Sequence, residues 1–243
     1  MSPAVGVVFK ADLAGRLVKR YKRFLADIET LDGRRLTVHC PNPGSMLGCA
    51  TPGAAVRCST SRNPQRRLAH TLEMIRVRNT WIGLHTTRAN ALVDTALSSG
   101  AIPALSGYAV RRREAVPGCL AAGVRFDFLL TGHARDPRPL WLEVKSATLA
   151  AEGGVARFPD SVTRRGRRHL ELLMELRRQG ARAALLFVIQ RADCQVVEPA
   201  DEIDPEYGRT LRAAAAEGVE ILAVRSRVSP RGLSLECPAE VRL

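Results

Sequence analysis

The chain has 243 residues, of which 46% are hydrophobic and 25% are charged, as in an ordinary globular protein of one large or two modest domains. Its net charge of +13 and pI near 10.5 indicate a polyanionic partner such as a nucleic acid. No run of about 18 apolar residues occurs, which excludes a membrane-spanning helix. Aromatic residues make up only 5%, so base stacking cannot be the main mode of binding.

The cysteines indicate a reducing compartment. Six are scattered along the chain, without a Cys-x-x-Cys motif, at Cys40, Cys49, Cys58, Cys119, Cys194 and Cys237. This spacing fits neither a zinc finger nor a disulfide framework. The N-terminus also has no basic-then-apolar signal peptide. We therefore expect reduced thiols in a cytoplasmic protein.

Residues 5–86 read as a series of short strands separated by turn sequences such as Asp32-Gly33 and Pro52-Gly53. Strands are expected at 6–9, 15–20, 24–29, 36–40, 54–58, 72–77 and 80–84. This number of strands over about eighty residues predicts a five-stranded OB-like barrel. Its basic residues would form a nucleic-acid-binding face, with an ordinary solvated surface as the alternative; they are Arg20, Lys22, Arg23, Arg62, Arg66 and Arg67.

A helix at 88–100, followed by Pro103, begins a second domain, so we divide the chain into domains 1–86 and 87–243. The second domain alternates strands and helices and is expected to be α/β. Strands are predicted at 108–114, 125–130, 140–146 and 183–190, and 219–224 is predicted to be the final strand. Helices are predicted at 162–179, with Asp160 or Ser161 as the N-cap, and at 204–216. A turn is expected at 157–160.

The first turns of helix 162–179 carry an unusual run of basic residues: Arg164, Arg165, Arg167, Arg168 and His169. Cations at a helix N-terminus oppose the helix dipole at about 0.3–1 kcal/mol each. Such an arrangement indicates an anion nearby, either a substrate phosphate or an acidic site. A solvated charge run is the alternative.

The stretch from Arg125 to Ser146 carries the candidate chemistry. Two apolar strands contain Asp127, Glu143 and Lys145, and buried charges need partners or a metal. Glu143 and Lys145 point to the same face of a strand, and a hairpin would bring Asp127 beside them. The carboxylates would hold Mg²⁺ or Mn²⁺, and Lys145 would position water or balance charge. Glu114 is a candidate third ligand. The alternative is a cross-strand salt bridge.

Several ordered motifs resemble the sugar fermentation stimulation protein A (SfsA) family nearly end to end. They include Arg20–Asp27, His39–Met46, Asp127–Leu130, Glu143–Ser146 and Phe158–Leu170. The resemblance implies an N-terminal OB-like domain and a C-terminal PD-(D/E)xK nuclease-like domain. It also implies DNA binding and a link to the regulation of sugar (maltose) metabolism genes.

Carried over by position, the nuclease-like motif falls on Asp127, Glu143 and Lys145, with Glu114 as the upstream acid. A second family signature falls on Thr163, Arg165, Gly166 and His169, which we expect beside the site. Phe126 replaces the proline of the motif, and Val124 and Pro43 are further departures. None of these removes a proposed metal ligand.

These inferences leave three hypotheses. In the first, the chain is a DNA-binding protein with metal-dependent phosphodiesterase activity. In the second, it is a non-catalytic DNA-binding regulator with a vestigial site. Carboxylates that face a polyanion repel it, which favours the first hypothesis or at least metal binding. In the third, RNA replaces DNA as the partner, because the basic charge serves either polymer; nothing in the sequence reads the 2′-hydroxyl that would distinguish RNA.

Overall fold

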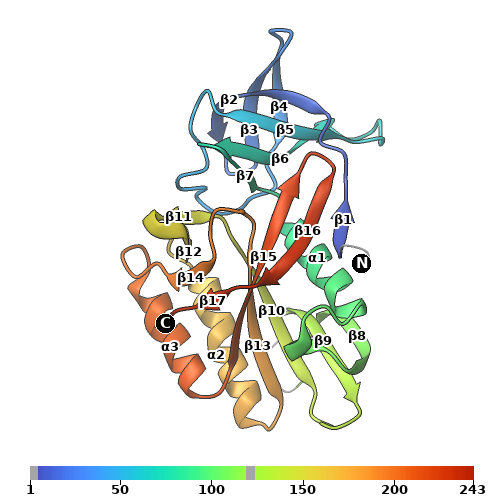
Figure 1. Ribbon diagram of the computed structural model, residues 1–243, viewed down its shortest axis with the longest axis vertical. Coiled ribbons are helices and arrows are strands. Elements are labelled where there is room, and N and C mark those ends of the chain that lie inside the picture. The colour runs from blue at the N-terminus through green and yellow to red at the C-terminus, as the bar shows by residue number, and fades with distance from the viewer. Residues whose placement is uncertain (1–4, 119–123) are drawn as a thin grey trace.

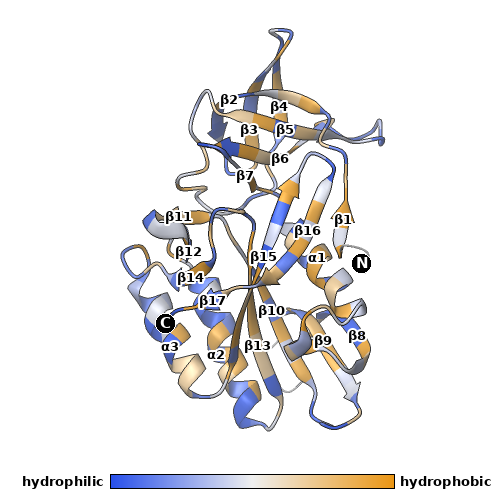
Figure 2. Ribbon diagram, in the orientation of Figure 1, coloured by the Kyte–Doolittle hydropathy of each residue, from blue (hydrophilic) through white to orange (hydrophobic). Residues whose placement is uncertain are grey.

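A computed structural model describes residues 5–118 and 124–243 and shows a barrel joined to a larger α/β domain (Figure 1). Cys119, whose thiol is expected to be reduced, lies outside the described residues. No helix in the described ranges is long and apolar enough to cross a membrane. Apolar residues concentrate along the strands and on the inner faces of the helices (Figure 2).

The N-terminal barrel is closed by five strands: β2 (Leu13–Tyr21), β3 (Leu25–Thr30), β4 (Arg35–His39), β5 (Ala55–Thr60) and β6 (His70–Val77). They pair in the order β4-β3-β2-β5-β6, and a parallel contact between His39 and Thr71 joins β4 to β6. Alternating apolar residues such as Leu17, Ile28 and Val38 fill its interior. This confirms the predicted OB-like barrel. Strand β7 (Thr80–Gly83) extends from β6 toward the second domain.

The C-terminal domain is built on a seven-stranded mixed sheet in the order β1-β16-β15-β13-β10-β9-β8. Its strands are β1 (Gly6–Val8), β8 (Tyr108–Ala115), β9 (Phe126–His133), β10 (Leu140–Ala147), β13 (Arg182–Ile189), β15 (Glu220–Ser229) and β16 (Gly232–Pro238). Helix α1 (Thr86–Ser98) covers one face, and α2 (Arg164–Arg178) and α3 (Pro205–Ala216) cover the other. A short 3-10 turn, Pro103–Leu105, follows α1. The predicted α/β class is confirmed.

The first strand departs from the expected division into domains 1–86 and 87–243. Strand β1 does not belong to the barrel but pairs antiparallel with β16, with Val8 opposite Gly232. Phe9 and Ala11 are likewise buried in the core of the second domain. From Gly6 onward, the described chain lies first in the second domain, then crosses to the barrel and returns, because strand β1 completes the edge of the larger sheet.

A small second sheet was not predicted. It contains β11 (Leu149–Ala151), β12 (Val155–Phe158), β14 (Val196–Pro199) and β17 (Glu240–Val241), with a 3-10 turn at Glu152–Gly154. The turn expected at 157–160 is therefore partly strand. The prediction that 219–224 is the final strand was also wrong, because β16 and β17 follow β15.

The N-cap of helix α2 was also predicted wrongly. Thr163, rather than Asp160 or Ser161, accepts the hydrogen bond from the Gly166 backbone N–H, at 3.0 Å. The Asp160 carboxylate instead accepts a hydrogen bond from the Met46 backbone N–H of the barrel, at 2.8 Å. A Cβ on Gly44 would lie 2.6 Å from both oxygens of that carboxylate, so only glycine permits this close contact between the domains.

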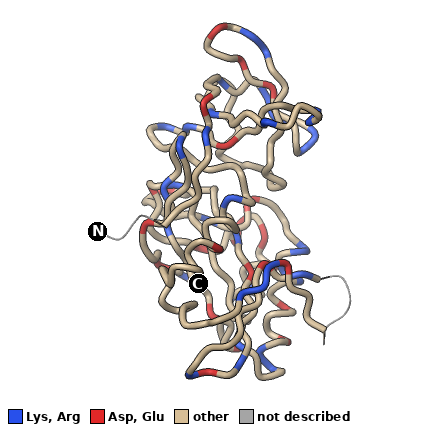
Figure 3. Tube along the Cα trace, turned by 90° about the vertical axis from the view of Figure 1, so that its right-hand side faces the viewer, with Lys and Arg blue, Asp and Glu red and all other residues tan. Residues whose placement is uncertain are grey.

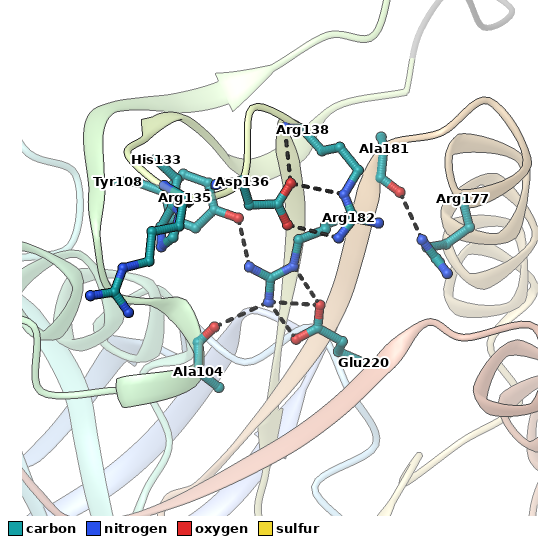
Figure 4. A network of polar contacts seen from close by, with 10 residues as sticks. All are labelled: Ala104, Tyr108, His133, Arg135, Asp136, Arg138, Arg177, Ala181, Arg182 and Glu220. Atoms are coloured by element: carbon teal, nitrogen blue, oxygen red, sulfur yellow. Dashed lines mark hydrogen bonds and ion pairs between the residues drawn. The ribbon is translucent and has the colours of Figure 1, made fainter.

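At the end of the larger sheet that lies away from the barrel, a polar network fixes the start of β13 (Figure 4). Arg182 donates to Glu220 through two nitrogens, both at 2.8 Å, and to the Tyr108 hydroxyl at 2.8 Å. Its guanidinium is thus fully engaged within the fold. Although Lys and Arg occur throughout both domains (Figure 3), some of these cations are structural.

Candidate active site

A cleft of about 500 Å³ lies between the barrel and the C-terminal domain. The barrel side contributes Arg23 and the loop Asn42–Gly44, and the start of α1 contributes Thr86 and Thr87. The C-terminal domain contributes Asp127, Glu143 and Lys145, together with Asp160–Thr163 and Arg165. The structure therefore brings together three of the four residues predicted to form the site, all but Glu114. We call this feature the interdomain cleft.

The geometry of β9 and β10 explains why these side chains converge. The two strands pair antiparallel up to Leu142 opposite Phe128. Beyond this point, the Val144 backbone N–H donates to Oδ2 of Asp127 at 2.7 Å instead of to a strand carbonyl. Glu143 and Lys145 alternate with apolar Val144 and share one side of β10. The hairpin predicted from sequence is thus confirmed, with the carboxylate of Asp127 at its open end.

Asp127 is held in a setting that disfavours its charged form. Burial and the nearby Glu143 raise the pKa of its carboxyl to about 6, although the hydrogen bond from Val144 and the charge of Lys145 oppose this shift. The Asn90 side-chain amide of α1 donates to the other oxygen, Oδ1, at 2.5 Å. Burial disfavours the charged carboxylate, and repulsion from the second acid adds to this effect, which together account for the raised pKa.

Glu143 is 4% exposed but is stabilised as a carboxylate. Burial by itself would raise its pKa, but Lys145 and His169 outweigh burial and hold the pKa below its ordinary value. The Lys145 Nζ and the His169 Nδ1 both contact Oε1 of Glu143. The acid is therefore positioned from two sides, by its own strand and by α2.

His169 does not lie where the sequence analysis expected a phosphate contact. It is 4% exposed, packs against Phe126 at 5.8 Å between ring centroids and contacts Glu143. The Arg165 Nε reaches its Nε2 at 3.4 Å. His169 lies on the apolar face of α2 with Leu172, Leu173 and Leu176, so helical periodicity could have shown that it points inward.

Glu114 is likewise not brought into the cleft. It is exposed on β8, has a left-handed backbone with φ of 49°, and is absent from the residues that line the cleft. The irregular backbone interrupts the pairing of β8 with β9 between Arg113 and Ala115. The unshifted register still places Glu114 opposite Asp127 on the neighbouring strand, but its side chain is exposed and is not grouped with Asp127 and Glu143 among the described residues.

The barrel cations fall into two groups. Arg20 donates to four backbone carbonyls, those of Arg23, Asn42, Gly44 and Ser45, at 2.7–3.2 Å, so it organises the loop beside the cleft rather than facing solvent. Arg23 lines the interdomain cleft, and Lys22, Arg66 and Arg67 line a second groove on the barrel. Arg62 is exposed and lines neither.

Among the α2 cations, Arg165 lines the cleft and Arg164 is exposed at the first turn. Arg168 forms a surface pair with Glu171 at 3.1 Å. Of these three arginines, only Arg165 lines the interdomain cleft.

Three functional positions were missed by the sequence analysis: Asn90, which holds Asp127; Asp160, which holds the barrel loop; and Arg20 as an organiser of that loop. Asn90 lies within the helix predicted at 88–100. A single Asn gives no periodic pattern, so its role could not be read from the sequence. Among the described residues, no three His, Cys, Asp or Glu side chains are grouped as a metal site. Any metal bound by Asp127 and Glu143 would need further ligands from water or substrate.

The fold and the cleft together define a two-domain protein in which an OB barrel and an α/β domain share a polar cleft. Family models for the SfsA N-terminal OB domain and the sugar fermentation stimulation protein RE domain match residues 18–84 and 87–232. The chain therefore belongs to the sugar fermentation stimulation protein family. This confirms the resemblance seen in the sequence.

Known relatives cover nearly the whole chain. A sugar fermentation stimulation protein homolog from Halorhodospira halophila is 55% identical over 228 residues, 93% of each chain. A homolog from Syntrophotalea carbinolica is 50% identical over 218 residues, 90% of this chain and 91% of its own. The solved structure of Pyrococcus furiosus SfsA in complex with Ca²⁺ matches with a TM-score of 0.85 and 21% identity over 100% of both chains. At that identity, the match demonstrates a shared fold.

Proposed function

We propose that this protein binds nucleic acid and cleaves phosphodiester bonds in the interdomain cleft with the help of a divalent metal. The observation that carries this proposal is the convergence of Asp127, Glu143 and Lys145 at the base of a cleft with Arg23 and Arg165 on its sides. Carboxylates repel a polyanion unless a cation lies between them. An acidic site enclosed by cations is therefore suited to a metal and a phosphate together.

The residues present fit a divalent metal. The raised pKa of Asp127, caused by burial and by Glu143, reflects a repulsion that a bound cation would relieve. Both groups offer carboxylate oxygen, the ligand type preferred by Mg²⁺, Mn²⁺ and Ca²⁺. Mg²⁺ is commonly held by one or two carboxylates plus waters and substrate phosphates, so a site with two protein acids is sufficient. The Ca²⁺ complex of the similarly folded Pyrococcus furiosus protein supports a divalent metal of this kind.

In this proposal, Asp127 and Glu143 hold the metal, which when bound polarises the phosphate and activates water. The Lys145 ammonium lies beside Glu143 and balances negative charge that develops on the phosphate. His169 and Lys145 keep Glu143 ionised, and Asn90 with the Val144 N–H orients Asp127. Arg165 and Arg23 hold neighbouring phosphates.

One observation favours a second candidate, a DNA-binding regulator without catalysis. Glu143 already has two cationic or polar partners, Lys145 and His169, within the protein. A carboxylate neutralised in this way is stable without a metal. The relatives' name and the resemblance to a family linked with sugar metabolism genes fit such a role.

Calorimetric titration of Mg²⁺, Mn²⁺ and Ca²⁺ into the wild type and the Asp127→Asn and Glu143→Gln variants tests the proposal. Cleavage of single-stranded DNA, duplex DNA and RNA is followed in parallel. We expect metal binding and Mg²⁺- or Mn²⁺-dependent cleavage in the wild type, and loss of both in the two variants. Glu217→Gln serves as a matched control, because Glu217 lies in a surface pair with Arg178 at the C-terminus of α3.

Metal binding without cleavage of any of the three substrates would support the regulator. Absence of metal binding in the wild type would overturn the catalytic proposal. Cleavage that survives in both variants would also overturn it, because the acids assigned here would then not hold the metal.

A further inference from the structure

The second groove on the barrel and the interdomain cleft meet at one hairpin. Strands β2 and β3 are joined by the tip Lys22–Phe24. Lys22 lines the barrel groove, together with Tyr21, His39, Arg66 and Arg67, and the next residue, Arg23, lines the interdomain cleft. Consecutive Cα atoms are about 3.8 Å apart, so the two depressions share this tip as a common border.

A second segment also connects them. His39 ends β4 in the barrel groove, and Asn42–Gly44 line the interdomain cleft a few residues later. Arg20 holds this segment to the hairpin tip, because it donates to carbonyls of both Arg23 and Asn42, at 2.8 and 2.9 Å. The border between the two depressions is therefore built from two chain segments that one guanidinium ties together.

The barrel groove has the charge of a phosphate-binding surface. Lys22, Arg66 and Arg67 line it, and none of its described lining residues is acidic. Arg66 is oriented by His39, whose Nδ1 lies 3.3 Å from the Arg66 Nη2, and burial and Arg66 lower the pKa of His39 so that it stays neutral. The nearby Asp27 is engaged by Lys19 and by the hydroxyls of Tyr21 and Thr37.

The tip itself presents an aromatic ring between cations. Phe24 is 46% exposed in a chain whose aromatic content is 5%. Lys22 and Arg23 before it have φ of 49° and 60°, a left-handed conformation that glycine or asparagine adopts more readily. Glycine or asparagine would fit this backbone with less strain, yet the turn has two long cations followed by an exposed ring. An aromatic ring beside phosphate-binding cations is a base-stacking surface.

The burial of the acids in the cleft favours a single-stranded over a double-stranded polynucleotide. Glu143 is 4% exposed and lies at the base of a cleft enclosed by both domains. Duplex DNA is stiff over about 150 base pairs and cannot fold one backbone into such a cleft while keeping its bases paired. A single strand can turn a phosphate inward and leave an unstacked base on Phe24.

We propose that the barrel groove, the tip Lys22–Phe24 and the interdomain cleft form one continuous track for a single-stranded polynucleotide. The strand lies along Lys22, Arg66 and Arg67, stacks a base on Phe24 and delivers its backbone to Asp127 and Glu143. The assignment of the cleft end rests on the proposed function. The barrel end rests on binding alone and can be tested without cleavage.

The test measures fluorescence anisotropy of labelled 20-nucleotide oligothymidylate, oligouridylate and a DNA duplex of equal length, in EDTA so that no cleavage occurs. We expect the wild type to bind the single strands at least tenfold more tightly than the duplex. Phe24→Ala should weaken single-strand binding about tenfold, as loss of one stacked base does. The Arg66→Gln/Arg67→Gln variant should lower the slope of log affinity against log salt by about 1.4.

Arg76→Gln/Arg78→Gln is the matched control for charge. Both residues are exposed on the β6–β7 hairpin of the same barrel and line neither depression. This control should leave the salt slope unchanged. Duplex binding as tight as single-strand binding, an unaffected Phe24→Ala variant, or an equal change of slope in the control would overturn the track.

The two proposals fail separately. If metal binding and cleavage are present but the track variants bind normally, the track is wrong and the proposed function stands. If the track variants behave as expected but no metal binds, the track stands and the catalytic function is wrong.

Discussion

Asn90 donates its side-chain amide to Oδ1 of Asp127 at 2.5 Å, and so links helix α1 to the carboxylate at the base of the interdomain cleft. The backbone N–H of Val144 holds the other oxygen at 2.7 Å. Asp127 is thus oriented by two donors from two different elements. Groups that orient a metal ligand in this way affect metal affinity although they do not touch the metal.

Asn90→Ala should therefore weaken Mn²⁺ binding about 10- to 100-fold, the usual effect of losing an orienting partner. Calorimetric titration measures the change. Asn79→Ala, in the exposed β6–β7 turn, is the control and should bind Mn²⁺ as the wild type does. An unchanged affinity in Asn90→Ala would show that Val144 alone suffices to orient Asp127.

The stability of the metal-free protein should depend on the ionisation of Asp127. Burial and Glu143 raise the pKa of Asp127 from 3.8 to about 6. The folded state therefore keeps this proton where the unfolded state has lost it, and its stability falls as the pH rises through about 4 to 6. Asp127→Asn lacks this loss. The free energy of unfolding of the variant minus that of the wild type should rise by about 2–3 kcal/mol across this window.

Urea unfolding in EDTA at about pH 4 and pH 7 tests this difference. Comparing the variant with the wild type removes the contributions of all the other titrating groups. A difference that does not change with pH would mean that Asp127 titrates at its ordinary pKa in the folded protein.

His169→Ala should destabilise the protein by about 3–5 kcal/mol, because it removes one partner of a buried charged group and leaves a cavity beside Phe126. The pKa of Glu143 should rise, since His169 is one of the groups that lower it. Chemical denaturation measures the stability. His70→Ala, at a less buried position on the barrel, should have a much smaller effect. An equal loss in both variants would argue against a role for His169 in holding Glu143.

Arg20→Ala should behave as a structural variant rather than as loss of a phosphate contact. Four carbonyl hydrogen bonds to residues 23–45 would be lost, and we expect about 2 kcal/mol of destabilisation and faster proteolysis of loop 41–48. Arg16→Ala, which loses a single bond to the Gly53 carbonyl, is the matched control. If Arg20→Ala instead keeps full stability but weakens nucleic acid binding, the original prediction of a phosphate contact would be correct.

The thiols should differ sharply in reactivity. Burial raises the pKa of Cys49 to about 11, of Cys58 to about 12 and of Cys194 to about 11. Cys237 is exposed and free. In the native protein at pH 8, Cys237 should react quickly with a disulfide reagent and the three buried thiols slowly. Peptide mapping identifies each labelled site, and labelling after unfolding is the control. Rapid labelling of Cys58 in the native state would contradict the closed barrel.

The barrel and the central strands could be predicted because the period of their side chains is visible in the sequence. Leu17, Ile28 and Val38 alternate with polar residues, and charges inside otherwise apolar strands pointed to Asp127, Glu143 and Lys145 as a candidate site. In strands of two to four residues, such as β11 and β17, this period is too short to be seen. The pairing of β1 with β16 depends on contacts between the two ends of the chain, which local patterns do not encode.

The roles of individual cations could not be predicted. An arginine that binds backbone carbonyls and one that binds phosphate cannot be told apart in the sequence. Arg20 and Arg23 are three residues apart, yet Arg20 holds the loop and Arg23 lines the cleft. His169 was different, since its place on the apolar face of α2 was available in the sequence. Glu114 lies in a strand as predicted, but its exposed side chain and its left-handed backbone, with φ of 49°, could not be read from the sequence.

The pairing of β1 with β16 has a consequence for synthesis of the chain on the ribosome. The barrel strands all lie between residues 13 and 83, so the barrel can close as soon as that segment has emerged. Gly6–Val8, although made earlier, must wait for Gly232–Pro238 before it can join its sheet. Among the described strands, the first to be translated is therefore among the last to dock, and its backbone has no strand partner until β16 has been synthesised.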